Sequence, residues 1–93
     1  MVIGLVTASL SIPEARSLKD KRSVLRSLKD RALNKMNVSV AEVGKQDLWK
    51  HAELAFVTVG ADSKIVQKRV SGIQAFLRSN PRYVLISLHS EML

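Results

Sequence analysis

The chain has 93 residues, the size of a single domain, and it contains no cysteine, which excludes disulfides, thiolate metal sites and a cysteine nucleophile. Hydrophobic residues make up 46% of the sequence and charged residues 25%, a balance typical of a folded globular domain. The 15 Lys and Arg residues outnumber the 8 Asp and Glu residues, so the formal net charge is +7, which excludes an acidic surface and favours a polyanionic partner.

The first third of the chain predicts a strand followed by a helix. Apolar residues dominate Val2–Ile12 and alternate between two faces, as in a strand of a sheet. Ser17 and Asp20 have the spacing of a capping box, which predicts a helix over Leu18–Met36, and Asn37 suits a left-handed position after it. We expect the buried stripe of this helix to contain the apolar residues at helical spacing: Leu18, Val24, Leu25, Leu28, Ala32, Leu33 and Met36.

Two further strands and a second helix follow. Val38–Val43 is rich in β-branched residues, and Leu48–Val59 alternates over a longer stretch. Either Asp62 or Ser63 caps the next helix, which runs to about Ser79. Its expected buried stripe contains Ile65, Val66, Val70, Ile73, Phe76 and Leu77.

One basic residue and the last strand complete the pattern. Arg69 lies inside the apolar arc of the second helix, so either its stem packs while the charge reaches past the sheet edge, or the helix phase differs there. Arg82–Leu88 alternates as a final strand, with Tyr83 and Leu85 on one face and Val84, Ile86 and Leu88 on the other. The large rings of Phe56 and Tyr83 are expected in the core.

The element order β-α-β-β-α-β predicts an α+β fold, the ferredoxin-like sandwich, as one domain over residues 1–93. Two right-handed crossovers place the first and third strands in the centre of a four-stranded antiparallel sheet and the second and fourth at its edges. Both helices should then cover one face of the sheet and leave the other face open.

Three segments resemble the YlxP-like family of small bacterial proteins of unknown function. They are Ser17–Val24 (SLKDKRSV), Asn37–Val43 (NVSVAEV) and Gln46–Trp49 (QDLW). The resemblance covers nearly the whole chain and implies a ferredoxin-like fold. It also implies a gene often found beside translation and ribosome-maturation genes, and it brings no established catalytic residues.

The excess positive charge lies in the two predicted helices. Four basic residues of the first helix follow one another by three or four positions and form a ridge beside the apolar stripe: Lys19, Arg22, Arg26 and Lys29. Such a ridge can follow a phosphate backbone, with Lys64 and Lys68 of the second helix in support. The alternative is a solvated helix face that only keeps the protein in solution.

The open face of the sheet predicts self-association. Apolar side chains of the two central strands should meet there as one patch: Ile3, Leu5, Ala55, Val57 and Val59. An exposed apolar patch of this kind marks an interaction site, and a two-fold homodimer is its commonest outcome. A one-residue bulge in the first strand would exchange its faces and remove part of the patch.

The sequence predicts no catalytic residue, metal site or cofactor. Trp49, His51 and Glu53 alternate on one face of the predicted third strand, which we interpret as a polar strand end around a half-buried Trp rather than an acid–base or metal cluster. Apart from Trp49 at the start of the predicted third strand, the open face lacks the aromatic residues on which RRM-type proteins stack bases, so that mode of RNA binding is not expected.

These observations together predict a non-enzymatic, cytoplasmic accessory protein without a membrane segment. Its expected partner is structured RNA or a ribosomal particle, bound through the basic helix face and linked to translation or ribosome maturation. Two alternatives remain open: a self-associating interaction module, and a ferredoxin-like domain that senses a small molecule.

Overall fold

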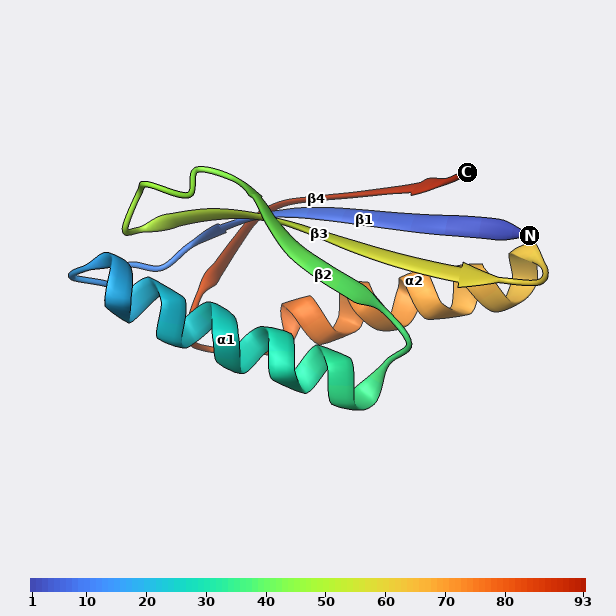
Figure 1. Cartoon of the computed structure of the whole chain (residues 1–93), viewed down its shortest axis with the longest axis horizontal. Helices are drawn as coiled ribbons and strands as arrows, with labels where there is room; N and C mark the ends of the chain where they lie inside the picture. Colours follow the sequence, from blue (N-terminus) through green and yellow to red (C-terminus); the bar gives the residue numbers. More distant parts are fainter.

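The computed structural model describes all residues 1–93 and contains four strands and two helices in the expected order. Their bounds are β1 Val2–Ser11, α1 Leu18–Lys35, β2 Ser39–Gly44, β3 His51–Gly60, α2 Ser63–Arg78 and β4 Val84–Met92. The strands form one antiparallel sheet in the order β2-β3-β1-β4, so the prediction that the first and third strands are central is confirmed. Both helices lie on the same side of the sheet (Figure 1), which confirms the ferredoxin-like fold.

The core lies between the sheet and the helices and is built from alternate strand positions and one stripe of each helix. Val6, Ala8 and Leu10 of β1 are buried, and so are the rings of Phe56 and Tyr83, as expected. The buried positions of the helices are Lys21, Val24, Leu28 and Ala32 on α1, and Val66, Val70, Ile73 and Leu77 on α2.

Helix α2 packs so closely on β1 that any side chain at position 4 would displace its neighbours. A Cβ atom on Gly4 would lie 2.7 Å from Val66 Cγ1 and 2.8 Å from Val70 Cγ2, well inside van der Waals contact. Any larger residue must therefore push α2 away from the sheet.

Both helices begin at the predicted caps. Ser17 Oγ accepts a hydrogen bond from the Asp20 amide at 3.1 Å, and Asp20 Oδ2 accepts one from the Arg16 amide at 2.9 Å. Asp62 rather than Ser63 caps α2, because its Oδ1 accepts a hydrogen bond from the amide of the third following residue at 3.0 Å. These bonds satisfy backbone donors that have no partner inside the helix.

Three helix predictions are wrong. Leu33 and Ile65 are 47% and 42% exposed, because each directly neighbours the buried stripe in sequence and points about 100° away from it around the helix. The left-handed residue expected at Asn37 is absent there: the cap Met36 is extended, and the one non-glycine residue with positive φ is Lys45, at 57°.

The third strand begins three residues later than predicted, at His51. Leu48 belongs instead to a turn, in which its amide donates to the Lys45 carbonyl at 3.1 Å. The carbonyl of Leu48 accepts a hydrogen bond from the side chain of Lys21 at 2.8 Å, so the segment is held by α1 rather than by a strand partner.

The last strand is longer than predicted and changes phase. Its pairing with β1 shifts by one residue, so that Ile86 has no partner and bulges out. Leu85 and Leu88 therefore pack against the core, which corrects the prediction that they lie on opposite faces. Val84 and Ile86 are 52% and 60% exposed.

Arg69 is half-buried, and the prediction that its stem packs while its charge reaches past the sheet edge is confirmed. Its stem passes the end of the sheet, and its Nη1 donates to the carbonyl oxygen of Val59, the penultimate residue of β3, at 2.6 Å. The helix phase is unchanged, since Val66 and Val70 on either side of it are buried.

Candidate nucleic-acid interface

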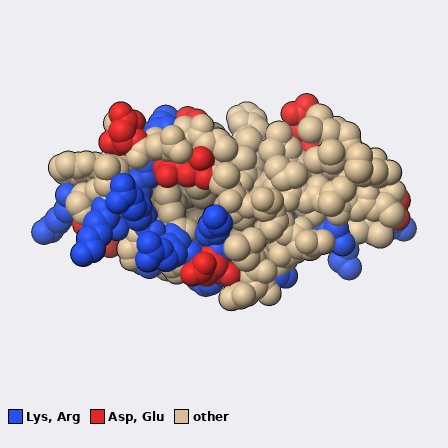
Figure 2. Space-filling view, viewed as in Figure 1, with Lys and Arg blue, Asp and Glu red and all other residues tan.

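Four basic side chains form a continuous ridge along the solvent side of α1. All four are exposed, because their positions on the helix face away from its buried stripe: Lys19, Arg22, Arg26 and Lys29. At 1.5 Å of rise per residue the ridge is about 15 Å long. Figure 2 shows the Lys and Arg side chains gathered over the half of the molecule that contains the start of α1. We call these four residues the α1 ridge.

No side chain of the α1 ridge forms an ion pair, although Asp30 lies four residues after Arg26 on the same helix. The structure contains two ion pairs, Lys21–Glu42 and Lys45–Glu53, and neither involves the ridge. Asp20, one of the two acidic residues of α1, accepts the backbone bond of the helix cap. The ridge therefore keeps its charge available for phosphate groups.

A groove separates α1 from the edge strand β2 and borders the ridge. It has a volume of about 510 Å³, and Arg22, Arg26 and Lys29 line its α1 side. The interior of the groove is apolar, because it is lined by Leu25, Leu28, Val40 and Leu54. The rest of the lining consists of Asp30, Ala41 and Glu42. Three of the four ridge residues thus stand over a concave surface rather than a flat one.

The two basic residues predicted on α2 do not join the ridge. Lys64 and Lys68 are exposed in the first turns of α2. That end of α2 lies beside the chain's N-terminus, whereas the ridge begins at the opposite end of the molecule (Figure 1), which is 42 Å long. The basic surface is therefore divided into a larger area on α1 and a smaller one on α2.

Lys21 is buried, which the sequence analysis missed. Its side chain is 2% exposed, and its Nζ donates to the carbonyl oxygens of Lys45 at 2.7 Å and Leu48 at 2.8 Å. The Glu42 carboxylate lies 2.7 Å from the same Nζ. A signal was available: position 21 precedes Val24 by three residues, so it falls on the buried stripe of α1.

Trp49, His51 and Glu53 do not form the alternating row predicted on β3. Trp49 lies in the loop before the strand and is 52% exposed, so its predicted place on the strand is wrong, and only His51 and Glu53 lie on β3. His51 is exposed, and Glu53 pairs with Lys45 at 3.4 Å. No group of three or more His, Asp or Glu side chains is placed to hold a metal ion.

The apolar patch expected on the open sheet face is present. Ile3 pairs with Val59 and Leu5 with Val57 in the β1–β3 register, so their side chains form two adjacent rows on the face away from the helices. Val57 is 39% exposed and Val59 is 49% exposed, while Ile3, Leu5 and Ala55 are half-buried. No bulge interrupts the pairing of β1 with β3, so the predicted parity of the first strand is confirmed.

Tyr83 closes the core near the end of α2. Its hydroxyl donates to the Leu77 carbonyl at 2.6 Å, and burial raises the pKa of Tyr83 to about 12, with the positive charge of Arg31 opposing part of that rise. The group is therefore a neutral structural donor in the physiological pH range.

Comparisons with known proteins agree with the resemblance seen in the sequence. The family described as "Protein of unknown function (DUF503)" matches residues 3–90. The chain is also similar to the "Uncharacterized protein YlxP" of Bacillus subtilis (strain 168), with 35% identity over 80 residues, which cover 86% of this chain and 87% of that protein. None of the helices has the length and apolar character needed to cross a membrane.

Proposed function

Because the chain belongs to the DUF503 family, whose description assigns no function, we propose a role from its own surface: it is a non-enzymatic accessory protein that binds structured RNA. The observation that supports this proposal is the α1 ridge, four exposed basic side chains in one row without an ion-pair partner. Basic residues in such a row bind phosphate oxygens and release counterions from the nucleic acid.

The form of the ridge favours a folded RNA over an extended single strand on the sheet. On the open face, β1 presents Ile3, Leu5 and Thr7, and β3 presents Ala55 and Val57, none of which is aromatic. Bases therefore have no stacking platform on the sheet. A straight helix with evenly spaced cations instead suits the regular phosphate backbone of a paired region, which proteins recognise mainly by shape and charge.

The proposal is tested by measuring the affinity for a fluorescent RNA hairpin by anisotropy at two salt concentrations. Arg22→Glu/Arg26→Glu is compared with Lys64→Glu/Lys68→Glu, which changes the net charge by the same amount at the other end of the molecule. We expect the ridge variant to bind at least about tenfold more weakly and to lose about two units of the salt slope, one for each lost phosphate contact. Equal effects of the two variants, or unchanged binding by both, would contradict a ridge-specific site.

The cellular target that we propose is a ribosomal particle in the cytoplasm, in line with the gene neighbourhood that the YlxP-like resemblance implies. Ribosomal RNA offers the dense phosphate surface that a sequence-independent basic ridge binds. We expect the wild type to co-sediment with ribosomal particles at low salt and the ridge variant to remain in the unbound fraction. Co-sedimentation of both at the same level would show that the ridge is not responsible.

A second candidate function, self-association as a homodimer, is supported by the apolar patch of the open sheet face. Sedimentation of Val57→Lys tests it, with Ile65→Lys as a matched control, because these side chains are 39% and 42% exposed on opposite sides of the molecule. We expect the wild type and the control to be dimers and Val57→Lys to be a monomer. A wild type that stays monomeric at high concentration, or a dimeric Val57→Lys, rules out this interface.

A further inference from the structure

The loop between β2 and β3, residues 45–50, presents the single tryptophan of the chain to solvent in a fixed position. Trp49 and its neighbour Leu48 are 52% and 44% exposed. An exposed indole on a mobile loop would be unremarkable, but this loop is held at several points.

The loop is held by Lys21 of α1 and by the residues that directly follow β1. Lys21 Nζ donates to the carbonyl oxygens of Lys45 and Leu48, and the amide of Ile12 donates to the Lys50 carbonyl at 2.8 Å. The Lys50 ammonium in turn donates to the Pro13 carbonyl at 3.1 Å. The backbone on both sides of Trp49 is thus fixed, so binding at the indole costs little conformational entropy.

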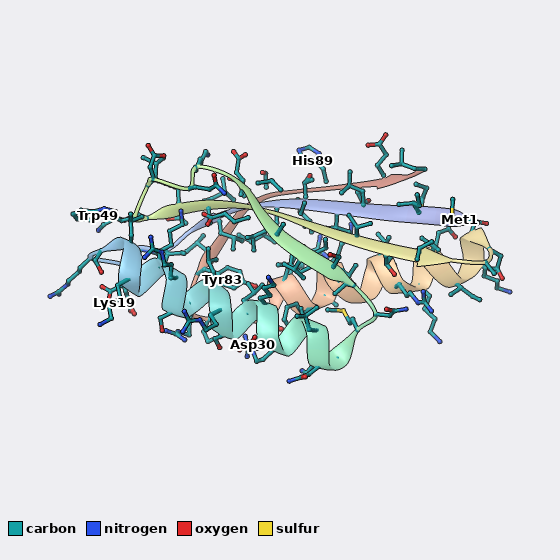
Figure 3. All side chains as sticks on the ribbon, in the orientation of Figure 1. Met1, Lys19, Asp30, Trp49, Tyr83 and His89 are labelled. Carbon is teal, nitrogen blue, oxygen red and sulfur yellow. The ribbon has the colours of Figure 1, made fainter.

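The same contacts bring the loop to the N-terminal end of α1, where the α1 ridge begins. Lys21, which holds the loop, lies between Lys19 and Arg22 in the first turns of α1. Figure 3 shows Trp49 and Lys19 at the same end of the molecule. Lys50 adds a cation next to the indole, and its hydrogen bond goes to a neutral carbonyl, so its charge is not paired.

The surface next to the indole is hollowed. A shallow depression of about 380 Å³ is lined by five consecutive residues: Asp47, Leu48, Trp49, Lys50 and His51. It combines two rings, a cation and a carboxylate, which are the groups that recognise an unpaired base by stacking, phosphate contact and hydrogen bonds to its edge. The cations of the adjacent ridge favour a nucleotide over an uncharged protein side chain as the occupant.

We propose that Trp49 is the stacking residue for one unpaired base of the RNA that the α1 ridge binds. This inference rests on the proposed function and adds a substrate class to it: RNA in which a loop or bulge lies next to a paired region. The ridge binds the phosphates of the paired stem, and the indole stacks on an unpaired base that lies outside the stem. The sheet plays no part in this contact.

Trp49 itself is the probe for the test, since no other tryptophan contributes to the fluorescence. Three polyanions are titrated into the wild type: an RNA hairpin with an unpaired loop, a fully paired RNA duplex with the same number of phosphates, and inorganic polyphosphate. We expect all three to bind in a salt-dependent way, and only the hairpin to quench Trp49 strongly. Trp49→Ala should weaken hairpin binding about 5- to 150-fold, the range expected from loss of one base–aromatic stack, and change duplex binding less than about twofold.

Further variants separate stacking from general apolar contact. Trp49→Phe should recover most of the hairpin affinity and Trp49→Leu should not, because only an aromatic ring stacks on a base. Ile65→Ala, at an apolar side chain that is 42% exposed on α2 and outside the depression, is the control and should leave hairpin binding unchanged. Circular dichroism confirms that each variant folds.

The outcomes distinguish this inference from the function on which it rests. If hairpin and duplex bind equally and Trp49→Ala affects neither, the ridge still binds RNA and the stacking role is wrong. If no polyanion binds, both proposals fail. If Trp49→Ala changes the sedimentation of the protein alone, the indole contacts a second copy of the chain, and its assignment to a base is overturned.

Discussion

Replacing Lys21 by Met tests the most unusual feature of the core, a lysine buried in an apolar stripe. Methionine keeps the length of the side chain and removes the ammonium, which makes two charge-assisted hydrogen bonds and one ion pair at 2.7–2.8 Å. Breaking a buried pair by removing one partner costs about 3–5 kcal/mol. The paired oxygen Glu42 Oε2 is buried, but the side chain as a whole is 25% exposed, and a rotation brings the carboxylate to water. We therefore expect the lower end of that range, about 3 kcal/mol.

The loss is measured by thermal unfolding, followed by circular dichroism and by the fluorescence of Trp49. At about 4–8 °C per kcal/mol for a domain of this size, Tm should fall by about 12–24 °C. The control is Lys19→Met, the same chemical change two residues earlier at an exposed position, which should leave stability unchanged. A Lys21→Met protein as stable as Lys19→Met would refute the assignment of Lys21 as the residue that fixes the loop.

A double-mutant cycle separates the ion pair from the loop contacts. Lys21→Met/Glu42→Leu removes both charges, so it should recover part of the lost stability, because a buried ion pair is often replaced by apolar groups without cost. The carbonyls of Lys45 and Leu48 still lack their donor. Hydrogen exchange in the loop should therefore stay as fast as in Lys21→Met; slow exchange would show that the loop does not depend on the lysine.

Three further predictions follow from the packing and the caps. Gly4→Ala should destabilise the protein by about 1–3 kcal/mol in thermal unfolding, because the new methyl group meets Val66 and Val70; unchanged stability would show that α2 shifts freely. Ser17→Ala should cost about 1 kcal/mol through loss of the cap, measured in the same assay, and no loss would mean that water replaces the hydroxyl. Tyr83, the single tyrosine, should titrate near pH 12 when followed by absorbance at 295 nm, and a midpoint near 10 would contradict its burial. The stability of the protein should fall as the pH rises above 10, because the tyrosine of the unfolded chain ionises first.

The fold could be predicted because the spacing of apolar residues within short segments indicates whether each segment is a strand or a helix. A few residues are enough to indicate which face is buried, as in the alternation of Val6, Ala8 and Leu10 on β1 and the stripe through Val66 and Val70 on α2. The exposure of the α1 ridge followed from the same phase, since positions beside a buried stripe point to solvent. The strand parity of the apolar patch was predictable for the same reason.

Three features that sequence reasoning missed depend on distant partners. Lysine is expected at the surface, and the burial of Lys21 requires the Leu48 carbonyl, 27 residues away, and the carboxylate of Glu42. The phase change of β4 depends on a bulge opposite β1, which no alternation within Arg82–Leu88 reveals. The separation of Lys68 from the ridge depends on the opposite directions in which the two helices cross the sheet (Figure 1).

Both edge strands carry a bulge, and this protects a sheet that is covered on one face alone. Val43 is the extra residue on β2 and Ile86 the extra residue on β4, where the pairing with the neighbouring strand shifts by one. A regular edge would offer an unbroken row of amide and carbonyl groups to another chain, the first step of fibril growth. Each bulge interrupts that row and turns the edge, so neither edge offers a second chain a regular ladder to extend.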